Sequence, residues 1–125
     1  MAIIVFDKDS IIKYVPAYGD NRESENPCIV NLKYISYSRV QFYAKLLASR
    51  NKGTNDVSKI YEYGQEMQKK QFVENVESIS GFFIGDKEIT DPAEFYESAP
   101  TQLIYEIIKA MEDSQKLSEG QRKNS

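Results

Sequence analysis

Hydrophobic and polar positions alternate in the first third of the chain, as they do in β-strands. The clearest case is residues 28–35, where hydrophobic side chains take every second position and the polar Asn31 and Lys33 lie between them. The β-branched segments 2–6 and 11–15 flank the polar sequence DKDS, a pattern that predicts a hairpin. We therefore expect small antiparallel strands in the N-terminal part.

Beyond residue 36 the apolar period lengthens to about 3.6 residues, which is typical of amphipathic helices. Four helices are expected, over residues 37–51, 56–80, 92–98 and 100–113. Ser38 and Gln41 have the spacing of a capping box near the start of the first helix. Gly64 interrupts the second helix and favours a kink or a close helix contact there. The most regular stripe belongs to the last helix and consists of Leu103, Ile104, Ile107, Ile108 and Met111.

Turn residues between the second and third helices predict a short β-hairpin over residues 82–89. Gly81 is expected to end the preceding helix, and Gly85-Asp86 has the residue types that adopt the positive φ angles of a two-residue turn. Asp91 and Pro92 are preferred at the N-cap and at the first position of a helix. The expected role of this segment is to reverse the chain and begin a helix.

Together these elements predict an α+β fold with one apolar core. The chain has 125 residues, too few to give each half a sizeable core of its own. Residues 1–113 are expected to form a single globular domain, in which residues 16–27 form a long surface loop. Residues 114–125 are polar, with Leu117 as their one aliphatic residue, and are expected to form a flexible tail.

The composition excludes several kinds of chemistry. The chain has no histidine and therefore lacks the commonest general base and the commonest transition-metal ligand. Cys28 is the only cysteine, which excludes an internal disulfide, and burial is its expected role. Asp7 and Asp9 have the spacing of a calcium loop but lack its glycine and distal glutamate. We therefore expect no enzyme, no cofactor and no metal site.

Charge and hydropathy limit the possible partners. The net charge is −3 and the basic residues form no stripe, so no nucleic acid is expected to bind. The sequence has neither a secretory signal pattern nor an apolar run that spans a membrane, and a cytoplasmic location is expected. Nine tyrosines are available for protein contacts, although most are expected to cap the core. Protein binding is favoured over catalysis, because it needs none of the missing residue types.

Three segments carry a resemblance to a known family. In their order, FVENVESISGFFIGDKEITDPAEFYESAP, the amphipathic helix LIYEIIKAM and the tail KLSEGQRKNS resemble the tail assembly chaperones of phages and prophages. The resemblance covers mainly residues 72–125, with additional support from IVNLKYISYSRVQFYAKLLASR. It implies a non-enzymatic, mostly helical protein of the bacterial host cytoplasm. Such a protein coats the helical tape-measure protein, helps to recruit tail-tube protein and is absent from the finished virion.

The resemblance implies that exposed apolar helix faces shield the tape-measure helix. The residues expected to contact this partner are Tyr61, Phe72, Leu103, Ile107 and Met111. Core packing is the alternative interpretation for the stripe of residues 100–113. A structural component of a phage tail or head-tail junction, a small host adaptor protein, and a small enzyme using carboxylates, tyrosine or lysine stay open as alternatives. Self-association into a homo-oligomer is compatible with a small core and exposed stripes.

Overall fold

The structure, a computed structural model, describes the backbone of residues 10–124 and the side chains of residues 10–113. Its elements are β1 (Ile11–Tyr14), the 3-10 helix η1 (Tyr18–Glu23), β2 (Ile29–Lys33), α1 (Tyr37–Asn51), α2 (Val57–Asn75), β3 (Val76–Ser80), β4 (Phe83–Ile84), β5 (Lys87–Glu88), α3 (Pro92–Ser98) and α4 (Thr101–Asn124). The α+β class is therefore confirmed. The expected strand 2–6 lies outside the described residues.

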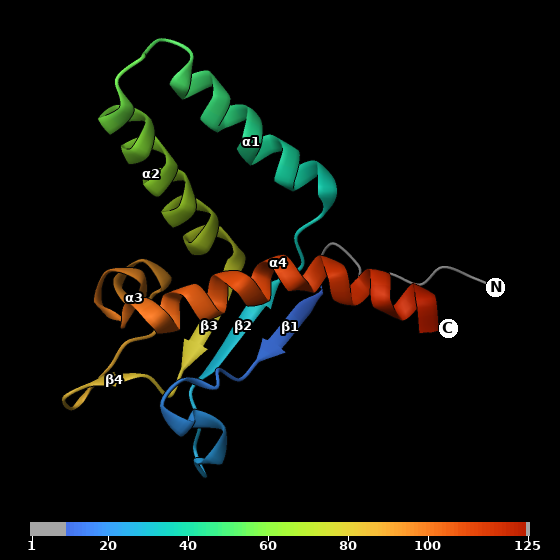
Figure 1. The fold of residues 1–125 in the computed structure, drawn as a ribbon. Coiled ribbons are helices and arrows are strands. Elements are labelled where there is room, and N and C mark those ends of the chain that lie inside the picture. Colours follow the sequence, from blue (N-terminus) through green and yellow to red (C-terminus); the bar gives the residue numbers. More distant parts are fainter. Residues whose placement is uncertain (1–9, 125) are drawn as a thin grey trace.

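The described strands form one three-stranded antiparallel sheet and one small hairpin. The sheet has the order β1-β2-β3, and its register places Ile12 opposite Leu32 and Val30 opposite Ile79. The strands expected within 11–15 and 28–35 are thus confirmed, and they are neighbours. The third strand follows α2 in the chain, so the sheet joins segments that are far apart in sequence (Figure 1).

The prediction of one helix over residues 56–80 is wrong in its last five residues. The helix α2 ends at Asn75, and Val76 already has extended backbone angles, φ −90° and ψ 112°. The register against β2 shifts between Asn31 and Leu32, which leaves Glu77 as an extra residue in a bulge. Because of this bulge, Val76 and Ile79 both point into the core although they are three positions apart. A spacing of three residues is also found on one side of a helix, which is why the sequence predicted a helix here.

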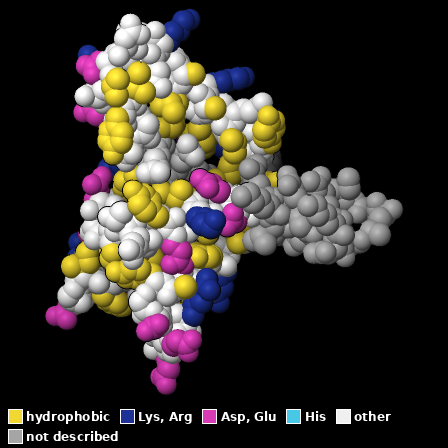
Figure 2. Space-filling model, in the orientation of Figure 1, with side chains coloured by type: hydrophobic (Ala, Val, Ile, Leu, Met, Phe, Trp, Pro, Cys, Tyr) yellow, Lys and Arg dark blue, Asp and Glu magenta, His cyan; other side chains and the backbone are white. Residues whose placement is uncertain are grey.

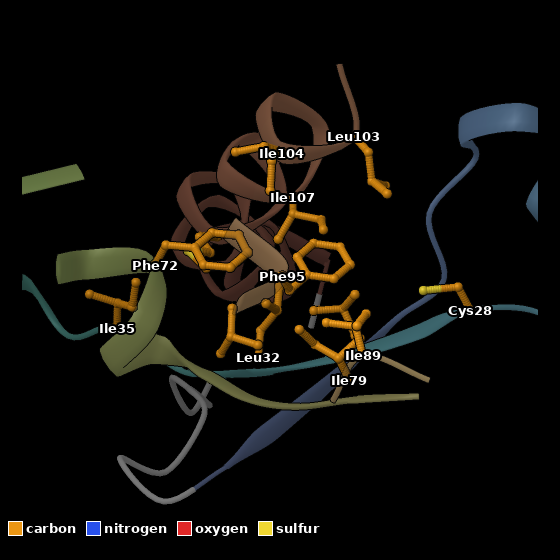
Figure 3. Close-up of a cluster of buried hydrophobic side chains, with 13 residues drawn as sticks. Cys28, Leu32, Ile35, Phe72, Ile79, Ile89, Phe95, Leu103, Ile104 and Ile107 are labelled. Atoms are coloured by element: carbon orange, nitrogen blue, oxygen red, sulfur yellow. The ribbon is translucent and has the colours of Figure 1, made fainter. Parts of the chain in front are cut away.

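Helix α4 crosses one face of the sheet and encloses the apolar core (Figures 1 and 3). The core cluster consists of Cys28, Val30, Leu32, Ile35, Phe72, Val76, Ile79, Ile89, Phe95, Leu103, Ile104, Ile107 and Met111. Phe95 stacks on Phe72 with 6.0 Å between ring centroids and meets Phe82 edge-on at 4.7 Å. Burial of a large apolar side chain stabilises a fold by about 1.5–3 kcal/mol. This cluster therefore supplies most of the hydrophobic stabilisation of the described fold.

The predicted hairpin and the predicted cap of α3 are confirmed. Ile84 pairs with Lys87 across the turn, and Gly85 has a φ of +61°. The Asp91 side chain accepts a hydrogen bond from the Glu94 backbone N–H at 3.0 Å, and Pro92 begins α3. Of the expected Gly85-Asp86 pair, only the glycine has a positive φ.

The expected cap of α1 is wrong by two residues. Ser36 is the N-cap, and its side chain accepts a hydrogen bond from the Arg39 backbone N–H at 3.3 Å. Ser38 lies inside the helix, so the spacing of Ser38 and Gln41 forms no capping box. Ser36 is the last residue with extended backbone before the helix, and a cap requires that conformation.

Helix α4 is longer than its apolar stripe. Its backbone is helical from Thr101 to Asn124, and it continues beyond β1 (Figure 1). The last residues of this helix belong to the segment whose polar composition predicts a tail. The division into a domain of residues 1–113 and a flexible tail stays a prediction.

Gly81 does not end a helix but follows β3, at a close approach to another backbone segment. Its φ is +79°, and a Cβ at this position would lie 2.8 Å from the carbonyl oxygen of Pro27. We predict that Gly81→Ala lowers the free energy of unfolding by roughly 2–4 kcal/mol, because it adds backbone displacement to left-handed strain. Urea denaturation measures this loss.

Gly85→Ala is the matched control for this substitution. Gly85 has a φ of +61°, but no atom lies within 4 Å of a Cβ built there. The expected loss is therefore only about 1–2 kcal/mol, from the backbone conformation alone. Equal losses in the two variants would contradict the close approach at Gly81.

Candidate protein-binding surface

Helices α1 and α2 form an antiparallel pair that extends away from the sheet and α4 (Figure 1). The pair leaves the body after β2 and returns to it directly at β3, because no loop separates α2 from that strand. Only the base of the pair is therefore held by the core. The distal end, around residues 51–57, has mainly exposed side chains.

One side of this helix pair is free of charge over its length. We define this side as the hairpin face, which consists of Val40, Ala44 and Leu47 of α1 and Val57, Ile60, Tyr61, Gly64, Gln68 and Gln71 of α2. These positions repeat at intervals of three and four residues, so each set lies on one side of its helix. Charged residues lie on other sides of the pair, among them Lys45, Arg50, Glu62, Glu66 and Lys69.

Several apolar side chains of the hairpin face are solvent-exposed. The exposed fraction is 80% for Val57, 68% for Tyr61 and 41% for Val40. Figure 2 shows hydrophobic side chains distributed along the helix pair on the side turned toward the viewer. Scattered exposed apolar residues are ordinary, whereas large contiguous apolar patches mark interaction surfaces.

A cavity lies where the hairpin face meets the body. Its volume is about 340 Å³. It is lined by Ile35, Val40, Gln68, Gln71, Phe72, Ile108, Met111 and Glu112. Val40, Gln68 and Gln71 belong to both the cavity and the hairpin face, which shows that α1 and α2 contribute to the same side. The exposed row therefore leads into a concave end whose opposite wall is α4.

A charged cluster on another side of the helix pair holds α1 to the last turns of α2. The Glu74 carboxylate accepts hydrogen bonds from Arg39 at 2.7 Å, from the Tyr43 hydroxyl at 2.6 Å and from Lys70 at 2.8 Å. The buried Asn75 donates to the Tyr43 hydroxyl at 2.9 Å. These contacts keep the base of the pair in one geometry, which positions the hairpin face above α4.

The environment of the cluster sets the protonation states that its hydrogen bonds require. Hydrogen bonds from Lys70 and Tyr43, assisted by the charges of Lys70 and Arg39, hold the pKa of Glu74 below its ordinary value, although partial burial opposes this shift. Burial and the hydrogen bond to Glu74 raise the pKa of Tyr43. At neutral pH the carboxylate is therefore ionised and the phenol is protonated. The Arg39 guanidinium also lies 4.7 Å and 4.8 Å from the ring centroids of Phe42 and Tyr43.

The structure separates the five residues expected to contact a partner. Tyr61 lies exposed in the hairpin face. The other four are buried in the core: Phe72, Leu103, Ile107 and Met111. The stripe of α4 therefore packs in the core, in agreement with the alternative interpretation of its sequence. Phe72 and Met111 belong to the lining of the cavity, although Phe72 has an exposed fraction of 0% and Met111 one of 5%.

Tyr61 is the one member of the hairpin face among the expected contacts, and the other eight, including Val40, Val57 and Ile60, were not expected. Val57 and Ile60 belong to the same apolar stripe as Tyr61, and Val40 begins the stripe of α1. Their spacing was visible in the sequence. Nothing local distinguished them from buried residues, because exposure depends on which element packs against each helix.

Two features of the described residues bear on metal binding and on thiol reactivity. No group of three or more His, Cys, Asp or Glu side chains suitable for a metal ion occurs among them. Cys28 is buried, as expected, and burial raises the pKa of its thiol. The expected turn at Asp7 and Asp9 lies outside the described residues. The exposed apolar side chains of the hairpin face offer a surface for non-covalent contact with another molecule.

No protein-family model, curated protein or solved structure matches this chain. Among the described helices, none combines the length and the apolar character needed to cross a bilayer.

The cluster around Glu74 predicts a pH-dependent contribution to stability. The folded pKa is lower than the unfolded value of about 4.3, so this contribution is present above pH 4.3 and is lost as the pH falls through the folded pKa. The Glu74 side chain is 33% exposed, and solvent screening therefore keeps the effect small. We predict that Glu74→Gln lowers the free energy of unfolding at pH 7 by about 1 kcal/mol and flattens its decrease in acid.

Urea denaturation between neutral pH and about pH 3 tests this expectation, since the range includes the ordinary pKa of glutamate. Glu77→Gln is the control, because Glu77 is an exposed glutamate of β3 outside the cluster. That variant should keep the acid dependence of the unchanged protein. An unaltered acid dependence in Glu74→Gln would show that the cluster contributes no pH-dependent stability.

Proposed function

We propose that this protein is a non-catalytic polypeptide-binding protein and, more specifically, a phage or prophage tail assembly chaperone. In this proposal the hairpin face binds the apolar stripe of the tape-measure helix before tail-tube protein covers that helix. The observation that carries the proposal is the uncharged row across α1 and α2, which ends in a cavity against α4. The chaperone role itself is supported by the sequence resemblance.

The chemistry of the hairpin face favours a helix with a neutral, apolar stripe as the partner. A charged stripe would lose hydration on this face without gaining an opposite charge. Apolar contact would be stabilised by about 25 cal/mol for each Å² removed from water. An amphipathic helix in a groove between helices is a recurrent mode of recognition.

Reversible shielding agrees with the exposed character of this face. Because the partner would contact side chains at the surface, binding requires no opening of the core. Tail-tube protein could then replace the chaperone through a larger interface. We propose a cytoplasmic location in the bacterial host for this step. We also propose that the protein self-associates into a homo-oligomer. A structural component of the tail or head-tail junction and a small host adaptor protein are the alternative functions.

Tyr61→Asp is predicted to weaken capture of the tape-measure protein at least roughly tenfold, because it places an unpaired charge in an apolar contact. The side chain is 68% exposed, so the fold should be retained. Co-expression with the tape-measure protein of the same genome, followed by affinity purification and quantification of both chains, measures the effect.

Ser49→Asp is the matched control for this experiment. Ser49 is exposed and lies on the side of α1 opposite Val40 and Ala44, so the variant adds the same charge away from the hairpin face. It should capture the partner normally. Equal capture by the folded Tyr61→Asp variant would exclude the hairpin face as the contact. Stoichiometric retention of the protein in purified particles, measured by mass spectrometry, would instead support the structural alternative.

A further inference from the structure

The cavity at the base of the hairpin face has the size and lining of an anchor pocket. Resting on the proposed function, we propose that it receives one large aromatic side chain of the bound helix, with tryptophan preferred. The occupant would contact lining residues of α1 and α4, among them Val40, Ile108 and Met111. This assigns a specific role to the concave end of the surface.

The volume of the cavity is sufficient for one bulky side chain. Pockets for small molecules usually measure about 300–1,000 Å³. At about 340 Å³ this cavity lies near the lower limit of that range. One bulky side chain fits such a space while the rest of its helix remains on the hairpin face. The continuity through Val40, Gln68 and Gln71 places the pocket where a residue of the same partner helix would arrive.

The walls of the cavity favour an aromatic occupant over an aliphatic one. The Met111 thioether belongs to the lining, and thioethers make favourable contacts with aromatic rings. Buried aromatic anchors in pockets contribute a large share of the affinity at many protein interfaces. Val40 and Ile108 add further apolar surface to the lining.

The polar rim distinguishes tryptophan from phenylalanine. Glu112 lines the cavity and is exposed, so its carboxylate can accept a hydrogen bond from an arriving indole N–H. The Gln68 side-chain oxygen already accepts a hydrogen bond from the Tyr96 hydroxyl at 3.3 Å. Glu112 is the one charged residue of the lining, and we assign it as the acceptor for the anchor. A hydrogen bond to a charged acceptor is stronger than one between neutral groups.

Synthetic helices with a single variable position test this assignment. The probe is an acetylated, amidated peptide built from alanine and glutamine, with leucines spaced as one helical stripe and tryptophan, phenylalanine or alanine at the central position of that stripe. The chain contains no tryptophan, so the peptide would be the sole source of indole fluorescence. Titration of full-length protein gives the dissociation constants and the shift of the emission maximum for the tryptophan peptide; calorimetry gives the constants for the other two.

We expect the tryptophan peptide to bind at least roughly tenfold tighter than the alanine peptide and to show a blue-shifted emission. Val40→Phe should remove this preference, because its larger side chain occupies the cavity. Glu112→Ala should reduce the preference for tryptophan over phenylalanine while keeping the preference for phenylalanine over alanine. These ratios compare peptides on the same protein and therefore do not depend on the stability of a variant.

Two results would overturn the anchor pocket. If the three peptides bind equally and Tyr61→Asp weakens all of them, the hairpin face binds helices but the cavity receives no aromatic side chain. If Val40→Phe keeps the full preference for tryptophan, the anchor binds elsewhere. Absence of binding by every peptide, combined with failure of the tape-measure capture described above, would reject the proposed function and the anchor together.

Discussion

The packing of α4 onto the three-stranded sheet determines which apolar surface of this protein is hidden and which is exposed. The stripe that includes Leu103 and Ile107 enters the core together with Phe95 of α3. A small domain has room for one such core. Once α4 covers the sheet, no described element covers the outer part of the helix pair α1 and α2. The exposed hairpin face is therefore a consequence of how the core is filled.

Helix α2 connects these two regions. Its C-terminal end places Phe72 in the core, stacked on Phe95, while its N-terminal end carries Tyr61 into solvent. On another side of the same helix, Glu74 binds Arg39 and Tyr43 and fixes the neighbouring helix. The helix pair is thus anchored at its base by apolar packing and by charge-assisted hydrogen bonds. The distal part has few buried contacts, which is typical of regions of low local stability.

A division of the surface by charge gives this arrangement its functional interpretation. The charged residues of the helix pair lie away from the row that includes Val40, Ile60 and Tyr61. Charged and uncharged side chains therefore occupy different sides of the same two helices. In the proposed function, this neutral face would contact apolar stripes without specific charge pairing, as shielding of a long helix of varied sequence requires. The cavity against α4 adds one position at which such a surface can discriminate between side chains.

The sequence by itself determined the α+β class, the positions of most helices, the turn at Gly85-Asp86 and the apolar character of each stripe, because periodicity and turn preferences are local properties. Only the tertiary structure decided that residues 76–80 form a strand. Val76 and Ile79 have helical spacing, but this segment pairs with β2 and has a bulge at Glu77. It also decided that Tyr61 is exposed while the similar stripe of α4 is buried. A local pattern shows that a helix side is apolar, but the element that packs against it comes from distant parts of the chain.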